Sequence, residues 1–194
     1  MKGIADFFAE HFPTKVRKIA VNAGLGCPNR DGKLSYGGCS YCNNAGFNPS
    51  YALESKGSIK DQIDAGIAFQ GKKAEGCACL AYFQSYSNTY GETPALIELY
   101  EQALSHPAIK GLVIATRPDC LENGLMDYFE RRFGRLAPQG HPFLLVELGI
   151  ESTCDRTLER INRGHDYACA RSAVLELHRR GILCGAHIIL GLPG

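Results

Sequence analysis

The chain of 194 residues lacks long hydrophobic runs, and it lacks an excess of charge of either sign. No stretch approaches the roughly 20 apolar residues that a membrane-spanning helix needs. Asp6 and Glu10 interrupt the segment that would be apolar in a secretory signal, so we expect a cytoplasmic protein with no membrane partner. The net charge of +1, with acids and bases interspersed, indicates no polyanion-binding face, but a local basic patch for nucleic acid stays open.

Internal repeats, low-complexity segments and domain linkers are absent as well. The hydrophobic fraction of 45% is ordinary for a globular protein, and the length is sufficient for a substantial core. We therefore expect one domain over residues 1–194, in which residues 1–15 form an N-terminal extension.

Cysteine, by contrast, is abundant. Nine cysteines in a cytoplasmic protein are expected to be reduced thiols, metal ligands or catalytic groups, and the odd number weakens a disulfide framework. Cys27, Cys39 and Cys42 are spaced C-x11-C-x2-C in a glycine-rich loop. The glycines allow this loop to fold back, so that all three sulfurs can meet at one centre. The sequence therefore favours a metal site here.

This group of three thiols has no obvious fourth ligand. A structural zinc site needs four ligands, and the sequence has no second C-x-x-C or H-x3-H to complete one. An iron-sulfur cluster held by three cysteines leaves one iron free for an external ligand. A thioredoxin-like site is a weaker alternative, because its C-x-x-C opens a helix directly after a strand, and scattered reduced thiols are a further one. The other cysteines are interpreted as packed thiols: Cys77, Cys79, Cys120, Cys154, Cys169 and Cys184.

Apolar segments alternate with helical patterns along the chain. The segments predict strands over residues 18–23, 77–85, 111–116, 143–149 and 183–190. Helices are predicted between them, over about 58–70, 93–106, 121–133, 152–161 and 167–180. This α/β pattern indicates a parallel sheet covered by helices, either an open doubly wound sheet or part of a barrel. Since the chain stops directly after the fifth predicted strand, we expect an incomplete domain whose last strand has an open edge.

Candidate chemistry lies where these strands end, because the carboxyl ends of parallel strands share one rim. The alternation of a strand places Glu147, Gly149 and Glu151 on the same face. A buried carboxylate needs a partner, and Arg163 in the segment "INRGH" is the best candidate.

Several ordered motifs together resemble a known family: "CPNRDG", "GGCSYC", "YFQSYSNTY", "TRPDCL", "VELGIES", "INRGHDY" and "HIILGLPG". From about Lys15 to Gly194 the chain resembles the radical S-adenosylmethionine (radical SAM) enzymes, and it is similar to their YhcC-like branch, which is related to the elongator catalytic subunit. The usual spacing of the family is C-x3-C-x2-C, so the gap of eleven residues in this chain identifies the branch.

The resemblance implies a partial TIM-type (βα) barrel of six strands, of which five are present. It implies that Cys27, Cys39 and Cys42 bind a [4Fe-4S] cluster, whose free iron site chelates S-adenosylmethionine (SAM). Reductive cleavage of SAM would generate a 5′-deoxyadenosyl radical that removes hydrogen from a substrate. The implied partners are an electron donor such as flavodoxin or ferredoxin and an unidentified substrate, for which a modified tRNA nucleoside is a candidate.

The resemblance also implies contacts to SAM from the loops after the first three strands. Tyr41 would pack near the adenine, or it anchors the turn of its loop. Gln84 and Ser85 would meet the methionine end, although this chain has "FQSYSNT" where many members have glycines. Thr116 would contact the ribose, or its "TRPD" segment is a turn fixed by Pro118.

Further contacts are implied beyond the fourth strand. Glu151 and Arg163 would bind the methionine moiety, or they form an ion pair that braces the turn. His187 would bind the ribose, or it is a hydrogen-bonded core histidine. The leading hypothesis is thus a radical SAM enzyme, and the alternative is a non-catalytic zinc or iron-sulfur module.

Overall fold

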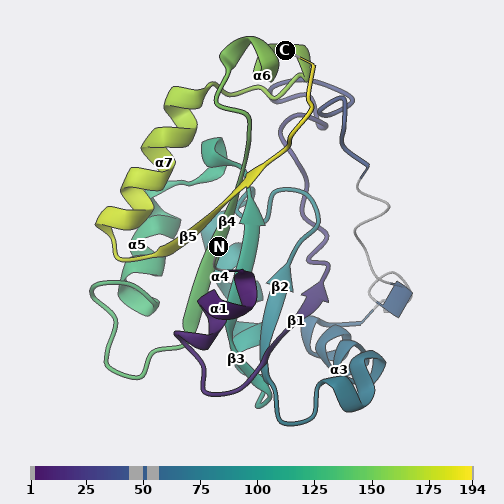
Figure 1. Cartoon of the computed structure of the whole chain (residues 1–194), viewed down its shortest axis with the longest axis vertical. Coiled ribbons are helices and arrows are strands. Elements are labelled where there is room, and N and C mark those ends of the chain that lie inside the picture. The colour runs from purple at the N-terminus through teal and green to yellow at the C-terminus, as the bar shows by residue number, and fades with distance from the viewer. Residues whose placement is uncertain (1–2, 44–49, 52–56, 194) are drawn as a thin grey trace.

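The structure is a computed structural model that describes residues 3–43, 50–51 and 57–193 (Figure 1). One parallel sheet runs through it in the order β1-β2-β3-β4-β5. The strands are β1 (Val16–Val21), β2 (Ala78–Phe83), β3 (Ile109–Thr116), β4 (Phe143–Glu151) and β5 (Leu183–Ile188). All five predicted strands are therefore confirmed, with shifts of a few residues at their ends.

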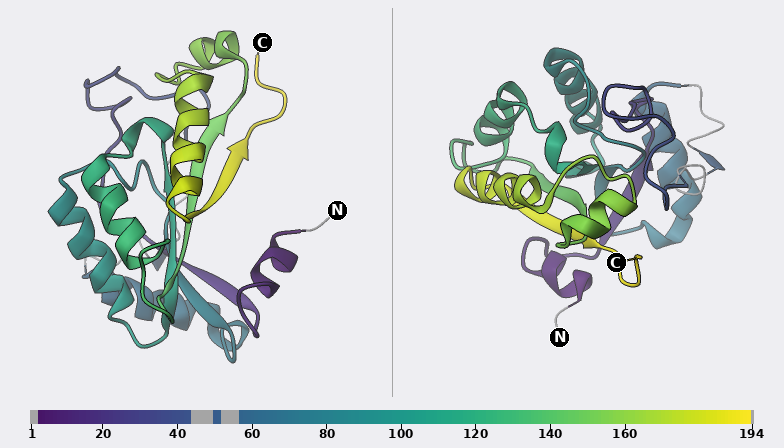
Figure 2. Two further views of the ribbon diagram at one scale, coloured as in Figure 1. Left: turned by 90° about the vertical axis from the view of Figure 1, so that its left-hand side faces the viewer. Right: turned by 90° about the horizontal axis from the view of Figure 1, so that it is seen from above.

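The order of the strands decides between the two predicted architectures. A doubly wound sheet reverses its strand order part-way, whereas each strand here lies beside the one that precedes it in sequence. Right-handed crossovers in a constant direction place the connecting helices on one face. Figure 2 shows these helices on the convex side of a curved sheet, so the fold is a partial (βα) barrel and not a doubly wound sheet.

The helices match the predicted pattern, with small corrections at their starts. They are α3 (Ile59–Gln70), α4 (Thr93–Leu104), α5 (Asn123–Arg132), α6 (Asp155–Arg160) and α7 (Tyr167–Arg179). The Ser58 side chain caps α3 by accepting the backbone N–H of Asp61, as the capping box predicts. Helix α4 begins one residue earlier than expected, because Glu92 occupies the N-cap position and Thr93 is already helical.

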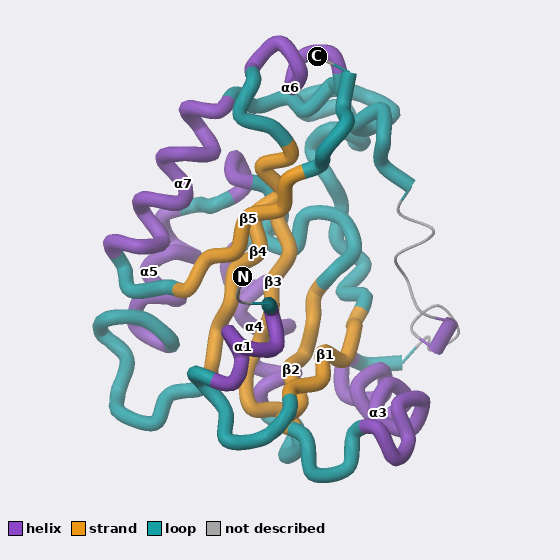
Figure 3. Tube along the Cα trace, in the orientation of Figure 1, coloured by secondary structure: helices purple, strands orange, loops and turns teal. Residues whose placement is uncertain are grey.

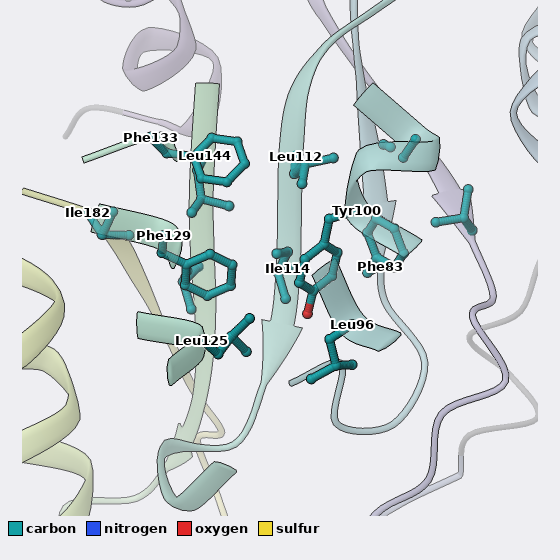
Figure 4. Close-up of a cluster of buried hydrophobic side chains, with 14 of the residues drawn as sticks. Phe83, Leu96, Tyr100, Leu112, Ile114, Leu125, Phe129, Phe133, Leu144 and Ile182 are labelled. Carbon is teal, nitrogen blue, oxygen red and sulfur yellow. The ribbon is translucent and has the colours of Figure 1, made fainter. Parts of the chain in front are cut away.

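The main core lies between the sheet and these helices (Figure 4). Tyr100 of α4 is fully buried, and its ring packs edge-on against that of Phe83 with centroids 5.2 Å apart. Its hydroxyl donates to the carbonyl of Asn88. The Asn88 amide in turn donates to the carbonyls of Phe83 (3.1 Å) and Ala115 (2.9 Å). The ends of β2 and β3 are thereby held together beneath the rim.

A second, smaller core fills the bottom of the concave face. It consists of Phe8 from helix α1 (Ile4–Ala9) with Leu80, Val113 and Leu145 from the sheet. The helix lies across the opposite face of the sheet from α4, as Figures 1 and 2 show. The predicted N-terminal extension therefore contains a helix, which the sequence analysis did not anticipate.

Strand β5 is more exposed than an interior strand of a barrel. Its last three residues face solvent, and Ile188 is 48% exposed. Within the described part of the chain it pairs only with β4, so its other edge is open there, as predicted (Figure 3). The strand ends at Ile188 and not at Leu190, which is 92% exposed.

Candidate functional site

A cavity of about 560 Å³ opens at the carboxyl ends of the strands, at the top of Figure 1. All three cysteines of the C-x11-C-x2-C motif border it. So do most of the predicted cofactor contacts, namely Tyr41, Gln84, Thr116, Glu151, Arg163 and His187. Ser85 is buried in the bend that follows β2 and does not line the cavity.

The cysteine loop is turned back on itself at its glycines. Gly37 and Gly38 both adopt a φ of +84°, a conformation that favours glycine, directly before Cys39. The backbone N–H of Cys42 donates to the carbonyl of Cys39 (3.0 Å), which closes a tight turn between the pair. Cys39 is buried, whereas Cys27 and Cys42 are half-buried, and all are free thiols.

Hydrogen bonds to the segment after α6, around residues 162–164, hold this loop in place. The buried amide of Asn29 donates to the carbonyls of Asn162 and Arg163, the latter at 3.0 Å. The Asn162 amide reaches back to the carbonyl of Gly38 at 3.0 Å. Gly164 is required for this approach, since a Cβ there would lie 2.5 Å from the Asn29 Oδ1. The "CPN" and "INRG" motifs are thus one structural unit.

Cys39 has two nitrogen donors close to its sulfur. Its sulfur lies 3.5 Å from both the Asn29 Nδ2 and the Arg163 Nη1, which are donors suited to a thiolate. In the described part of the chain, no three His, Cys, Asp or Glu side chains converge closely enough to hold one metal ion.

Glu151 and Arg163 form the predicted ion pair, with 3.6 Å between Oε1 and Nη2. Both side chains are buried, and Arg163 also donates to the carbonyl of Gly149. Glu151 reaches the cavity differently from the prediction. A register shift interrupts strand alternation after Gly149, and Glu151 has a φ of +67°. Glu147, Gly149 and Glu151 nevertheless all line the cavity, as predicted.

Glu147 has other partners than the predicted Arg163. Lys18 of β1 forms an ion pair with its Oε1, and the Tyr82 hydroxyl donates to its Oε2 at 2.8 Å. His187 lies 3.4 Å from the same Oε2. Burial by itself raises the pKa of Glu147, but the hydrogen bonds of His187, Lys18 and Tyr82 with the Lys18 charge outweigh it and lower the pKa to about 2.

His187 is not a core histidine. Its side chain is 53% exposed and it borders the cavity. The hydrogen bond to Glu147 raises the pKa of His187, while burial opposes this shift. The ring therefore has a larger protonated fraction at neutral pH than a free imidazole.

Two further predicted SAM contacts, Tyr41 and Thr116, interact with other residues of the protein. Burial raises the pKa of Tyr41 well above its usual range, and the Glu151 carboxylate acts in the same direction. Thr116 is buried, and its hydroxyl lies 2.6 Å from that of Thr89. The roles of Tyr41 and Thr116 as SAM contacts stay predictions.

Sequence reasoning missed Lys18 and Tyr82 at this site. Tyr82 lies two residues before Gln84, so strand periodicity would have placed it on the same face. Lys18 carried no local signal, because its partner Glu147 is 129 residues away.

With this geometry established, comparison with known proteins identifies the family. The model of the radical SAM superfamily matches residues 21–194. The chain belongs to the radical SAM superfamily. It is 38% identical over 182 residues to protein YhcC of Escherichia coli (strain K12), which covers 93% of this chain and 55% of that protein. It is also 38% identical over 184 residues to the uncharacterized protein YtqA of Bacillus subtilis (strain 168), covering 95% and 55%. The chain thus spans about half the length of the curated relatives it matches.

Solved structures of radical SAM proteins show the same fold. Elp3 of the archaeon Methanocaldococcus infernus, with an N-terminal deletion, aligns with a TM-score of 0.55 and 18% identity, covering 92% of this chain and 39% of that one. The radical SAM methyltransferase TsrM of Kitasatospora setae, solved with cobalamin and a [4Fe-4S] cluster, aligns with a TM-score of 0.50 and 14% identity, covering 97% and 33%. The partial barrel predicted from the resemblance is confirmed. No helix in the described residues has the length and apolar character to cross a membrane.

Proposed function

We propose that this chain binds a [4Fe-4S] cluster through Cys27, Cys39 and Cys42 and binds SAM against it in the same cavity. One observation supports this most strongly: the three thiols border the cavity that the Glu151–Arg163 pair also lines. When bound, these cofactors supply an electron and a 5′-deoxyadenosyl radical for hydrogen abstraction. The electron would come from an external donor such as flavodoxin or ferredoxin, in the cytoplasm.

The side chains around the cavity suit the zwitterionic end of SAM. Arg163 offers a cation for the carboxylate, and Glu151 offers an anion for the amino group. Because these two side chains also pair with each other, both are oriented before SAM arrives. The Glu147–His187 pair lies deeper in the barrel, where it would orient polar groups of the ribose or of the substrate.

Anaerobic reconstitution with iron and sulfide, followed by an assay for 5′-deoxyadenosine, tests the proposal. We expect loss of the brown colour and of bound iron in each single alanine variant of Cys27, Cys39 and Cys42. Cys77→Ala is the matched control, since Cys77 lies at the opposite end of β2 from the cavity. Equal iron loss from Cys77→Ala would contradict the assignment. Iron binding without SAM binding would instead favour the alternative, a non-catalytic metal module.

A modified tRNA nucleoside is our proposed substrate class. Two tyrosines that line the cavity are exposed, Tyr41 (36%) and Tyr86 (39%). The Arg30 guanidinium lies 5.9 Å from the ring centre of Tyr86. Exposed aromatic rings beside cations favour stacking with unpaired bases. We expect Tyr86→Ala to weaken tRNA binding in a filter assay, with the distant Tyr128→Phe as control. No binding by the unaltered protein would refute this substrate class.

A further inference from the structure

Arg117, at the end of β3, is held rigidly in a buried position behind the cysteine loop. It is 2% exposed. Its Nε and Nη2 donate to the two carboxylate oxygens of Asp119, both at 2.8 Å. Nη2 also donates to the carbonyl of Arg163 at 2.7 Å. Three hydrogen bonds therefore fix the plane of the guanidinium and the direction of its remaining nitrogen.

That remaining nitrogen, Nη1, is buried and has no hydrogen-bond partner in the described structure. A buried donor without a partner is energetically costly, and more so when it is charged. Arg117 borders the cavity of the three cysteines. Among described residues, the other buried side-chain atom without a partner is Oδ1 of Asn29, between Cys27 and Cys39 in sequence. Unsatisfied polar atoms thus gather around the proposed cluster site.

Two cysteines, Cys27 and Cys120, lie close enough to Arg117 to act on its charge. Burial tends to lower the pKa of Arg117, but Asp119 raises it above its ordinary value, and Cys27 and Cys120 add smaller contributions in the same direction. Burial raises the pKa of Cys120 to about 12, so this thiol stays neutral. A cysteine that ligates a metal is a thiolate. Of these two cysteines, Cys27 borders the same cavity as Arg117 and is a proposed cluster ligand, so its sulfur is the acceptor on the side of Nη1 that the bound cluster would offer.

We propose that the unpaired Nη1 of Arg117 donates a hydrogen bond to sulfur on the Cys27 side of the bound cluster. Arg117 is then a positioning residue that raises the reduction potential of the cluster. This inference rests on the proposed function. A hydrogen bond to cluster sulfur stabilises the reduced, more negative state, so its loss makes reduction harder. Arg117 also links the end of β3 to the "INRG" loop through its hydrogen bond to the carbonyl of Arg163. It therefore connects the proposed cluster site to a residue of the proposed SAM site.

Arg117→Lys tests this inference, because it retains the positive charge and removes the fork of donors. The measurement is a redox titration of the reconstituted, SAM-free protein, followed by electron paramagnetic resonance. We expect the equilibrium constant for reduction of the cluster to fall about tenfold. This equals a shift of the reduction potential by about 59 mV to more negative values for a one-electron couple. Arg132→Lys is the control, since Arg132 of α5 does not border this cavity and pairs with Glu101 (2.8 Å).

Each outcome distinguishes the inference from the proposed function. If the unaltered protein assembles no cluster, the proposed function fails. If the cluster forms and Arg117→Lys leaves its potential unchanged, the inference is overturned; weaker SAM binding in that case would assign Nη1 to the SAM carboxylate. Should Arg117→Lys fail to load iron, the double variant Arg117→Met with Asp119→Asn removes both partners of the buried pair, and the same negative shift is expected.

Discussion

Replacement of Glu147 by glutamine tests the polar network inside the barrel. A fall in pKa from 4.5 to about 2 corresponds, at about 1.36 kcal/mol per unit, to an upper limit of about 3 kcal/mol. The Lys18 side chain is 26% exposed, so water can solvate its charge again after the change. We therefore expect Glu147→Gln to lower the free energy of unfolding by about 2 kcal/mol.

The difference in the free energy of unfolding between wild type and Glu147→Gln depends on pH through two pKa shifts of opposite sign. The lowered pKa of Glu147 gives stability that is complete above about pH 4.5 and is lost as the pH falls toward about 2. The raised pKa of His187 gives stability that is complete below its ordinary value of 6.5 and is lost as the pH rises through the raised value. The difference between wild type and Glu147→Gln should be largest between about pH 5 and 6.

Urea unfolding of the apoprotein across this pH range measures the difference. Glu101→Gln is the control, because the hydrogen bond from Arg132 also lowers the pKa of Glu101, yet the side chains of Arg132 and Glu101 are 36% and 41% exposed. Solvent screens such a pair, so its loss should change stability far less. Equal losses in the two variants, or a difference for Glu147→Gln that does not vary with pH, would refute the reasoning.

The remaining predictions concern the SAM side of the cavity. Gly149→Ala should weaken SAM binding in anaerobic titration, because its Cβ would lie 2.5 Å from the Glu151 Oε1 and 2.7 Å from the Arg163 Nη2. Gly185→Ala on the next strand is the control, since its Cβ meets no atom closer than 3.6 Å; the same loss from both variants would contradict this account. Arg163→Ala should raise the dissociation constant for SAM while the cluster remains, because the cation for the carboxylate is lost. An unchanged constant would remove Arg163 from the SAM site.

Local patterns in the sequence predicted much of this fold. Apolar runs separated by helical spacing predicted all five strands, and the rule that parallel strands share a carboxyl rim gathered the cysteines, Glu151 and Arg163 at one place. The Glu151–Arg163 pair was predictable because a buried carboxylate needs a cation and few were near in sequence. Such inferences succeed where periodicity and the cost of burial act on residues close together in the chain.

Other features were decided only by the tertiary structure. The consecutive strand order excluded a doubly wound sheet, the bulge at Glu151 replaced regular alternation, and Lys18 rather than Arg163 became the partner of Glu147. The hydrogen bond from Asn29 to Asn162 and the unpaired Nη1 of Arg117 likewise depend on which loops meet at the rim. The sequence by itself determined which segments become strands and which residues carry charge or sulfur, because those properties are local. Which strand lies beside which, and which charge meets which across more than a hundred residues, depends on the packing of the whole sheet against its helices.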